Sequence, residues 1–461
     1  MSVSEKQLAP EQASSPSHHS ESTTNELPQS EAGKEAIDEE AAVPKPAGPP
    51  PFKPPPGMAP ADFPDGGLTA WAVCAGAWCC LFASFGWITC IGVFQTYYQE
   101  HQLKNYSPSE VAWIPSVEIF IMQMGAPFCG KVFDGYGPRY LLLFGTVVHV
   151  FGIMMASLGK TYYQIFLAQS VCSAMGAACL FYGGMNSVMT WFFKRRALAS
   201  GIAASGSSLG GVIMPIMINK LLPQIGFGWT MRAIAFMFLG LLIFANITVK
   251  SRLSHTPRSW KMWDFIVPLK DPKFALLAVG SFFFFWGLFI PINFISLYGQ
   301  KHGMSTNFAA YQIAILNAGS VVGRILPGWA GDHFGKFNVT IITCLLSVIF
   351  TLALWIPAST NASITAFAVL YGIVSGTFVS MISPLVAQIS DIRQIGVRVG
   401  TCFMIVSLAA LTGNPIAGAL INADNGGYLG AQIFTGVVMT VGTILIASSR
   451  QMQAGAIFKK V

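Results

Sequence analysis

The sequence contains little charge. Only 10% of its 461 residues are Asp, Glu, Lys or Arg, and 53% are hydrophobic, whereas about one-quarter of an ordinary soluble domain is charged. Acidic residues are the scarcest: residues 1–65 hold 11 of the 20 Asp and Glu, which leaves nine for the rest of the chain against 23 Lys and Arg. This composition excludes a soluble globular protein for most of the chain. It predicts a basic membrane body with an acidic tail.

Sequence motifs of ATP-driven pumps and of common metalloenzymes are absent. The chain has no G-x-x-x-x-G-K-[ST] phosphate loop, no H-E-x-x-H and no paired C-x-x-C. We therefore expect no enzyme activity, no cofactor, no metal site and no nucleic-acid partner. All nine cysteines fall in predicted membrane spans, which is typical of small packing residues rather than of a disulfide framework.

Apolar stretches of the length that a helix needs to cross a bilayer, about 20 residues, recur from Ala70 to Ser449. The sequence predicts an all-α membrane protein with 12 spans, near residues 70–98, 110–131, 140–158, 162–190, 197–222, 230–249, 274–298, 306–328, 338–357, 362–388, 397–421 and 428–449. Span two should begin at Ser107, where a proline and a capping-box glutamate follow. The domains expected are a disordered tail (1–64), a six-helix bundle (65–250), a central loop (251–273), a second six-helix bundle (274–450) and a C-terminal tail (451–461).

Basic residues outside the tail lie mainly in the loops on one side of the predicted spans. Placing both termini in the cytosol puts 17 Lys and Arg inside and five outside, as the positive-inside rule requires. We expect an integral protein of the plasma membrane, with the vacuolar membrane as the alternative.

A short motif occurs twice at equivalent places. Residues 130–137, after span two, and residues 328–335, after span eight, both fit G-x-x-x-D-x-x-G and lie 198 residues apart. Two copies at the same place in a six-span period indicate a duplicated bundle. The glycines permit a tight turn and close helix packing.

The motif aspartates, Asp134 and Asp332, are candidate gate residues because each could pair with an arginine or with a helix N-terminus. The alternative for both is a plain turn with a solvated acid. The gate candidates also include basic residues at the same membrane side, namely Arg139, Lys194, Arg195 and Arg196. Membrane topology and anionic lipid alone would also explain the cluster 194–196.

These features resemble the major facilitator superfamily from about Asp65 to Arg450. Residues 64–71 are similar to the Asp-Gly-Gly-aromatic-Gly-Trp signature of the monocarboxylate porter family, lengthened by one residue. Residues 191–206 resemble that family's second signature, with Trp191 in place of tyrosine and Ser205 in place of alanine. The two matches point to the fungal branch. They imply the major facilitator fold of two six-helix bundles.

Arg324, in predicted span eight, is the leading substrate-binding candidate, because an ionisable group inside a membrane is costly. Its planar guanidinium suits a carboxylate, and the resemblance implies this role for an arginine in the matching part of span eight. The alternative is an arginine that reaches the cytosol or pairs with Asp332. Asn317, Asn293 and Tyr371 are further polar candidates for the substrate site.

Two residues of the resembling animal carriers are missing. Ser320 stands where those carriers have an aspartate, and Thr89 stands where they have a lysine. Both belong to their proton-coupling machinery. Glu118, surrounded by apolar residues in span two, is the candidate substitute, and its alternative is a structural hydrogen bond to a neighbouring helix. His149 in span three is a weaker candidate, since a lone histidine on an apolar helix more often packs with a bonded ring.

The function expected is secondary active transport by alternating access, moving a small organic solute such as a monocarboxylate or another organic anion, with protons as a second partner. The alternative is an exporter of a secondary metabolite or a riboflavin carrier. A transport-incompetent solute sensor is the alternative of another class. The lipid bilayer is the expected environment.

Overall fold

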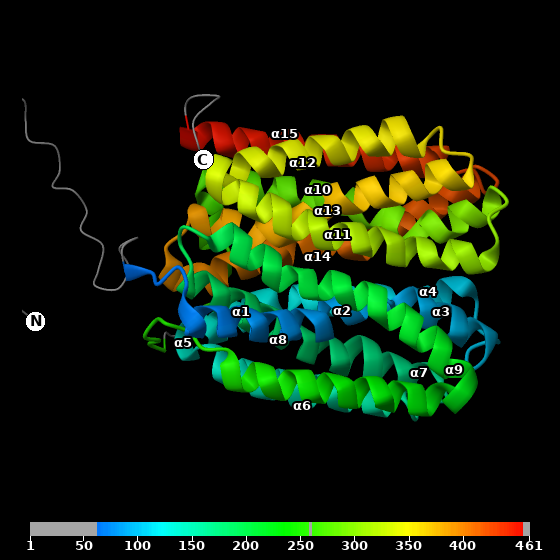
Figure 1. Ribbon diagram of the computed structural model, residues 1–461, viewed down its shortest axis with the longest axis horizontal. Coiled ribbons are helices and arrows are strands. Elements are labelled where there is room, and N and C mark those ends of the chain that lie inside the picture. The colour runs from blue at the N-terminus through cyan, green and yellow to red at the C-terminus, as the bar shows by residue number, and fades with distance from the viewer. Residues whose placement is uncertain (1–61, 258–260, 455–461) are drawn as a thin grey trace, which may run out of the picture. The chain divides into compact units, whose positions relative to one another are not determined.

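The computed structural model describes residues 62–257 and 261–454 and is helical throughout its spans (Figure 1). The predicted tail 1–64 falls almost wholly outside these residues, and so does 455–461 of the predicted C-terminal tail. By length and composition, 11 of the described helices can cross a membrane.

Several helices in the first half of the described chain are interrupted. Its elements are α1 (Gly67–Ala83), α2 (Phe85–Ile88), α3 (Ile91–Glu100), α4 (Pro108–Met124), α5 (Ala126–Tyr136), α6 (Pro138–Ala156), α7 (Tyr162–Ile165), the π-helix η2 (Phe166–Ser173), α8 (Ala174–Trp191) and α9 (Arg196–Thr248). Predicted span one is therefore three helices, broken at Ser84 and again before Ile91.

Helix α9 contains predicted spans five and six. A kink at Gly226 divides it, with φ 72° and ψ 171°, a backbone region that is essentially restricted to glycine. Because predicted spans five and six follow each other in α9 without an intervening loop, the 12 predicted spans correspond to 11 membrane-length helices.

The second half is more regular. Two short 3₁₀ helices, η3 (Met262–Phe265) and η4 (Val267–Lys270), form part of the central loop. They are followed by α10 (Pro272–Lys301), α11 (Thr306–Phe334), α12 (Lys336–Phe350), the π-helix η5 (Thr351–Trp355), α13 (Asn361–Gln388), η6 (Ile392–Gln394), α14 (Ile395–Ala423) and α15 (Leu429–Ala454).

Helices of the two halves pack against each other, mainly in three pairs. Helix α9 packs along α11, and α14 packs along α4 and α5. In Figure 1, α10 to α15 gather above α1 to α9, so these contacts run along the boundary between two helical groups. A site between the halves therefore lies among α2, α4 and α9 on one side and α10, α11, α13 and α14 on the other.

Local sequence signals for helix ends and packing are confirmed. Ser107 and Glu110 form a reciprocal capping box at the start of α4, with Ser107 N donating to Glu110 Oε2 at 2.7 Å. Some helices extend several residues beyond the predicted spans, such as α11, which ends at Phe334 rather than at residue 328. All nine cysteines have free thiols; eight are buried and Cys172 is partly buried.

Candidate functional site

One end of the helical body carries both repeated motifs, residues 130–137 and 328–335, and is called here the motif end. The motifs are the last turns of α5 and α11 with the glycine that ends each helix, rather than loops. In the first motif, the carboxylate of Asp134 accepts hydrogen bonds from the backbone N–H groups of Gly396 and Val397, both at 2.9 Å. These groups belong to the first turn of α14, in the other half. A helix N-terminus has unpaired N–H groups and a partial positive charge. Asp134 therefore bonds and neutralises the start of α14.

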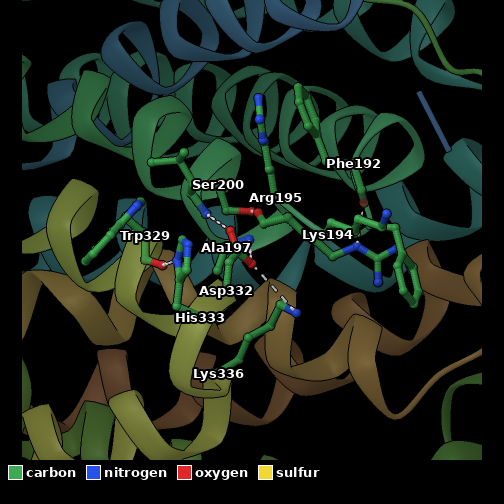
Figure 2. A network of polar contacts seen from close by, with 12 residues as sticks. Phe192, Lys194, Arg195, Ala197, Ser200, Trp329, Asp332, His333 and Lys336 are labelled. Carbon is green, nitrogen blue, oxygen red and sulfur yellow. Dashed lines mark hydrogen bonds and ion pairs between the residues drawn. The ribbon is translucent and has the colours of Figure 1, made fainter. Parts of the chain in front are cut away.

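The second motif makes the same contact in the opposite direction. Asp332 accepts hydrogen bonds from the N–H groups of Ala197 at 3.0 Å and Leu198 at 2.9 Å, in the first turn of α9 (Figure 2). Lys336 Nζ lies 3.8 Å from the same carboxylate. An arginine and a helix N-terminus were the two partners predicted for each aspartate. Both aspartates bind a helix N-terminus.

The first glycine of each motif allows this approach. A Cβ on Gly130 would lie 2.0 Å from the carbonyl oxygen of Gly396, and one on Gly328 would lie 2.7 Å from that of Ala197. Each glycine thus contacts the same helix start that its own aspartate caps. The two halves are held together at the motif end by two equivalent sets of contacts.

The predicted basic gate residues have different surroundings. Arg139, Lys194 and Arg195 are exposed, whereas Arg196 is buried. Arg196 donates to the carbonyl of Phe192 at 2.9 Å, and its guanidinium lies over the rings of Phe63 and Phe193. It therefore stabilises the segment before α9.

The two signature stretches contact each other. Asp65, in the first, accepts hydrogen bonds from the N–H groups of Phe193, Lys194 and Arg195 at 2.6, 2.7 and 3.2 Å. The side chain of Asp65 thus fixes the linker between α8 and α9. The sequence alone gives no reason to pair these stretches, because they are more than 120 residues apart.

The central loop also ties the halves together at the motif end. Lys131 of α5 bonds Asp264 of η3, and Arg398 of α14 lies 3.5 Å from Asp271. A cavity of about 480 Å³ lies between this loop, the first motif and the start of α14. His255 lines it and bonds the carbonyl of Asp134 through Nδ1 at 3.2 Å.

Arg324 is buried at the boundary between the halves, with 4% of its surface exposed. It donates to the carbonyl of Ala204 at 2.7 Å and to Ser207 Oγ, both on α9, and its Nε lies 3.3 Å from Ser320 Oγ. Ser320 also accepts a bond from Ser208 at 3.1 Å. Among the described residues, no carboxylate bonds Arg324, which excludes a pairing with Asp332. The burial of the side chain excludes a direct path from the guanidinium to solvent.

A small cavity adjoins Arg324. It is lined from both halves by Phe85, Thr89, Leu288, Phe289, Ile292, Leu316, Asn317, Ser320, Arg324, Ser375, Gly376 and Val379. Its volume is about 20 Å³, enough for one water molecule. A second cavity of about 10 Å³ shares Phe289 and adds Ile119, Phe285, Trp286, Ala409, Ala410, Gly413 and Asn414. An organic solute fits only if the halves separate.

Two of the predicted substrate-site residues lie elsewhere. Tyr371 is fully buried, and its hydroxyl donates to the carbonyl of Leu288 at 2.9 Å, which joins α13 to α10. Asn293 is exposed on α10, one residue after the cavity-lining Ile292. Of the four predicted substrate-site residues, Asn317 and Arg324 line the cavity.

Glu118 lies fully buried within the first half, away from the cavity. Its two carboxyl oxygens accept hydrogen bonds from Trp87 Nε1 at 2.8 Å and Gln169 Nε2 at 3.0 Å. Tyr98 in turn donates to Gln169 Oε1 at 2.8 Å. Glu118 thus connects α4 to α2 and to the π-helix η2.

Sequence reasoning missed the aromatic and small residues of the cavity. Phe85, Phe289 and the serines of α9 line the site or bond Arg324. In the aromatic run 282–286, Phe285 and Trp286 line the second cavity. The usable signal is the set of small residues at helical spacing in predicted span five, because such residues allow another helix to approach closely. They are Gly201, Ser205, Gly206 and Gly210.

The comparison with protein families decides the identity. The family model described as "Major Facilitator Superfamily" matches residues 76–370. The chain belongs to the Major Facilitator Superfamily. This membership, with the fold, makes the protein an integral membrane transporter.

Relatives within this superfamily are fungal. The chain is 49% identical over 87% of its length to "MFS-type transporter 1" of Ophiocordyceps sp., covering 90% of that protein. It is 45% identical to the "Fujikurins efflux protein" of Gibberella fujikuroi, with 84% of each chain covered. It is 39% identical to the "Aspyridones efflux protein apdF" of Emericella nidulans, covering 85% of this chain and 79% of the relative.

Solved transporters share the superfamily fold. The human organic anion transporter MFSD10 aligns with a TM-score of 0.66 at 13% identity, over 83% of this chain and 100% of the other. FucP in the outward conformation aligns with a TM-score of 0.64 at 14% identity, over 83% and 98%. At such low identity these similarities concern the fold alone.

Proposed function

We propose that this major facilitator protein exports an amphipathic organic anion, a secondary metabolite, by alternating access. Two relatives that align over most of this chain are named for the efflux of fujikurins and aspyridones. Their names favour export over the uptake of a small monocarboxylate. The observation that carries the proposal is the environment of Arg324.

Arg324 has the chemistry of an anion site. A buried guanidinium without a bonded carboxylate keeps a charge that a bound anion can neutralise. Its present partners are a carbonyl and serine hydroxyls, which a solute carboxylate can displace without leaving another charge unpaired. Two parallel hydrogen bonds would orient the anion.

The remaining lining favours a solute with an apolar or aromatic body. Phe85 and Phe289 lie across the boundary from each other, with ring centroids 6.1 Å apart. Asn317 supplies an amide, and Leu288 and Ile292 supply aliphatic surface. Lactate or pyruvate would leave most of this surface uncovered. A larger hydrophobic acid would bury it, and burial of apolar area is the main source of affinity.

Access to the site requires the halves to separate at one end at a time. We assign the motif end to the cytosol, from the distribution of Lys and Arg, and with it both termini. Asp134 and Asp332 are then the cytosolic gate residues, since their bonds to α14 and α9 must break before a solute can enter from inside. Export from the cell favours the plasma membrane as the location of the protein.

Export against a gradient needs a driving force, and Glu118 is our candidate proton carrier. A carboxyl group in the membrane interior is costly in free energy and therefore indicates a functional site. Inward proton movement would then drive outward solute movement. Glu118→Gln should remove the pH dependence of net transport and leave solute exchange intact, whereas an unchanged pH profile would exclude the role.

The first test is ligand binding measured by melting temperature, because a ligand that binds only the native state raises it. The purified protein is heated with lactate, pyruvate, larger aromatic and polyketide acids, riboflavin, and neutral sugars. A rise with the larger acids that disappears in Arg324→Gln supports the proposal. Arg232→Gln is the matched control, because Arg232 bonds Ser157 within its own half. A rise with riboflavin or a sugar alone contradicts it.

Monocarboxylate transport is the second candidate. It is favoured by the contact between Asp65 and residues 193–195, which joins the two stretches that resemble the monocarboxylate porter signatures. A rise in melting temperature with lactate or pyruvate, and none with larger acids, would favour this candidate over the exporter.

A further inference from the structure

The short helix α2 occupies an unusual place in the first half. Four residues long, it is separated from α1 at Ser84 and from α3 at Thr89 and Cys90. Its residues face different neighbours. Phe85 lines the solute cavity, Gly86 lies against Gly210 of α9, and Trp87 bonds Glu118. Helix α2 therefore contacts both the cavity and the buried carboxyl.

The contact on the carboxyl side depends on a proton. Trp87 Nε1 is only a donor, and the Gln169 nitrogen that faces Glu118 is also a donor. An ionised carboxylate accepts both bonds. A proton on either oxygen removes the charge and occupies one lone-pair position, so both bonds become bonds to a neutral carboxyl group. Hydrogen bonds to a charged acceptor are about twice as strong as neutral ones, so the Trp87 bond weakens in either case.

The contact on the cavity side depends on where α2 lies. Phe85 packs against Phe181 at 5.7 Å and against Phe289 of the other half at 6.1 Å. Thr89, one residue after α2, also lines the cavity, and its hydroxyl bonds the carbonyl of Gly86 at 2.6 Å. A small rotation of α2 therefore moves two cavity-lining side chains together.

We propose that α2 couples the protonation of Glu118 to the shape of the solute cavity, with Trp87 as the positioning residue. The inference rests on the proposed proton role of Glu118. When Glu118 is ionised, Trp87 holds α2 so that Phe85 and Thr89 close the cavity. When Glu118 takes up a proton, α2 is released and the cavity lining changes. Proton and solute occupancy are thus linked although the two sites are separate.

Other titratable groups near this network are few among the described residues. The Cys90 thiol and the Tyr98 hydroxyl interact electrostatically with Glu118. His149 of α6 lies near the break between α1 and α2, where Nε2 is 3.0 Å from the carbonyl of Ala83 and Nδ1 is 3.0 Å from Ser173 Oγ. His149 is therefore the one competing source of a pH response, and the test includes it.

The test needs no known solute. Thr89→Cys places a thiol on the cavity lining, and its rate of labelling by a maleimide is measured between pH 5 and pH 8 in the purified protein. The protein without this substitution gives the background from the native cysteines. Labelling changes with pH through the thiolate itself, so each variant is compared with Thr89→Cys alone. Melting temperatures confirm that each variant is folded.

The expected result is that Glu118→Gln and Trp87→Phe each shift the labelling profile by about threefold or more from that of Thr89→Cys, toward a common profile. Trp355→Phe is the matched control, because Trp355 is also fully buried but its Nε1 has no bonded partner in the described residues. It should leave the profile unchanged. If Trp87→Phe does not fold, benzothienylalanine at position 87 removes the N–H and retains the ring shape.

The outcomes distinguish a failure of the coupling through α2 from a failure of the proton role of Glu118. If Glu118→Gln shifts the profile and Trp87→Phe does not, the coupling through α2 is wrong and the proton role of Glu118 stands. If Glu118→Gln leaves the labelling profile unchanged, the coupling is wrong, and the pH dependence of transport in the same variant decides the proton role separately. A shift in His149→Gln alone would then assign the pH response to His149.

Discussion

Asp134 Oδ1 lies 2.9 Å from the backbone nitrogen of Gly396, 262 residues further along the chain. Asp332 makes the equivalent contact with Ala197 at 3.0 Å. Each half thus gives one carboxylate to the other half and receives one. These reciprocal bonds are the basis of the first two predictions.

Replacing the motif aspartates should open the motif end. Asp134→Asn keeps one acceptor oxygen but loses the charge and the second acceptor, and Asp332→Asn does the same. Loss of a helix N-cap costs about 0.5–2 kcal/mol, which corresponds to about a 2- to 30-fold change in the open fraction. We expect labelling of Ser208→Cys, buried at the boundary, to rise accordingly. Asp391→Asn is the control, since Asp391 bonds the N–H of Arg393 within its own segment.

Gly130→Ala should prevent the motif end from closing, because the new Cβ would meet the carbonyl oxygen of Gly396 at 2.0 Å. Backbone atoms cannot move aside as a side chain can, so the halves must separate locally. We expect a lower melting temperature and faster labelling of Ser208→Cys. Gly418→Ala, where a Cβ meets nothing within 4 Å, should change neither. Equal behaviour of the two alanine variants would contradict the role of the close contact.

Gly226→Ala should destabilise the protein through its backbone. The φ of 72° and ψ of 171° at the kink in α9 are strained for any residue with a Cβ, at about 1–3 kcal/mol. No neighbouring atom lies within 4 Å of the new Cβ, so conformation alone is tested. The melting temperature should fall, whereas Gly240→Ala, in helical backbone with equally open surroundings, should keep it or raise it.

Ser320→Asp should convert Arg324 from an anion site into an ion pair. Ser320 Oγ lies 3.3 Å from Arg324 Nε, so a carboxylate here would reach the guanidinium. An internal anion competes with the solute, and we expect binding of an organic acid to weaken by about tenfold or more at pH 7.5. Acidification should restore part of the affinity by protonating the new carboxyl. Ser320→Asn, similar in size and uncharged, should show no such recovery.

His255 should add a pH dependence to stability. Burial lowers the pKa of His255 below its ordinary value of 6.5, against a smaller opposing effect of its bond to Asp134. The unfolded chain therefore binds the proton first, so the contribution of His255 is complete above about pH 6.5 and is lost as the pH falls toward the folded pKa. Between pH 7.5 and 5 the melting temperature of His255→Gln should fall less than that of the native protein. His101→Gln, at an exposed site, should keep the native slope.

The fold was predictable because its signals are local or repeated. Apolar runs, the capping box at Ser107 and two copies of G-x-x-x-D-x-x-G report helices and a duplicated bundle without any long-range information. The breaks around α2 and the π-helix η2 were not predicted, because hydropathy does not respond to a single backbone hydrogen bond that shifts register. The linkage of spans five and six depends on one backbone conformation at Gly226.

The site was predictable only in its charged residues. Arg324 and Glu118 were identifiable, since an ionisable residue in an apolar run is conspicuous. The partners Ser207, Trp87 and Gln169 were not, because each belongs to a different helix and its residue type is common in membrane spans. Tyr371 shows why the bonding partners of uncharged polar residues were not predictable. A buried tyrosine must bond something, and which carbonyl it meets depends on how α13 packs on α10.

The exchange of carboxylates between the halves limits how such a protein can change during evolution. A half expressed alone, or joined to the other half of a distant relative, would present a helix start without its aspartate and an aspartate without its helix start. Substitutions around Asp134 must therefore suit Gly396, and those around Asp332 must suit Ala197. Recombination between relatives should be tolerated best at breakpoints that leave both reciprocal pairs matched.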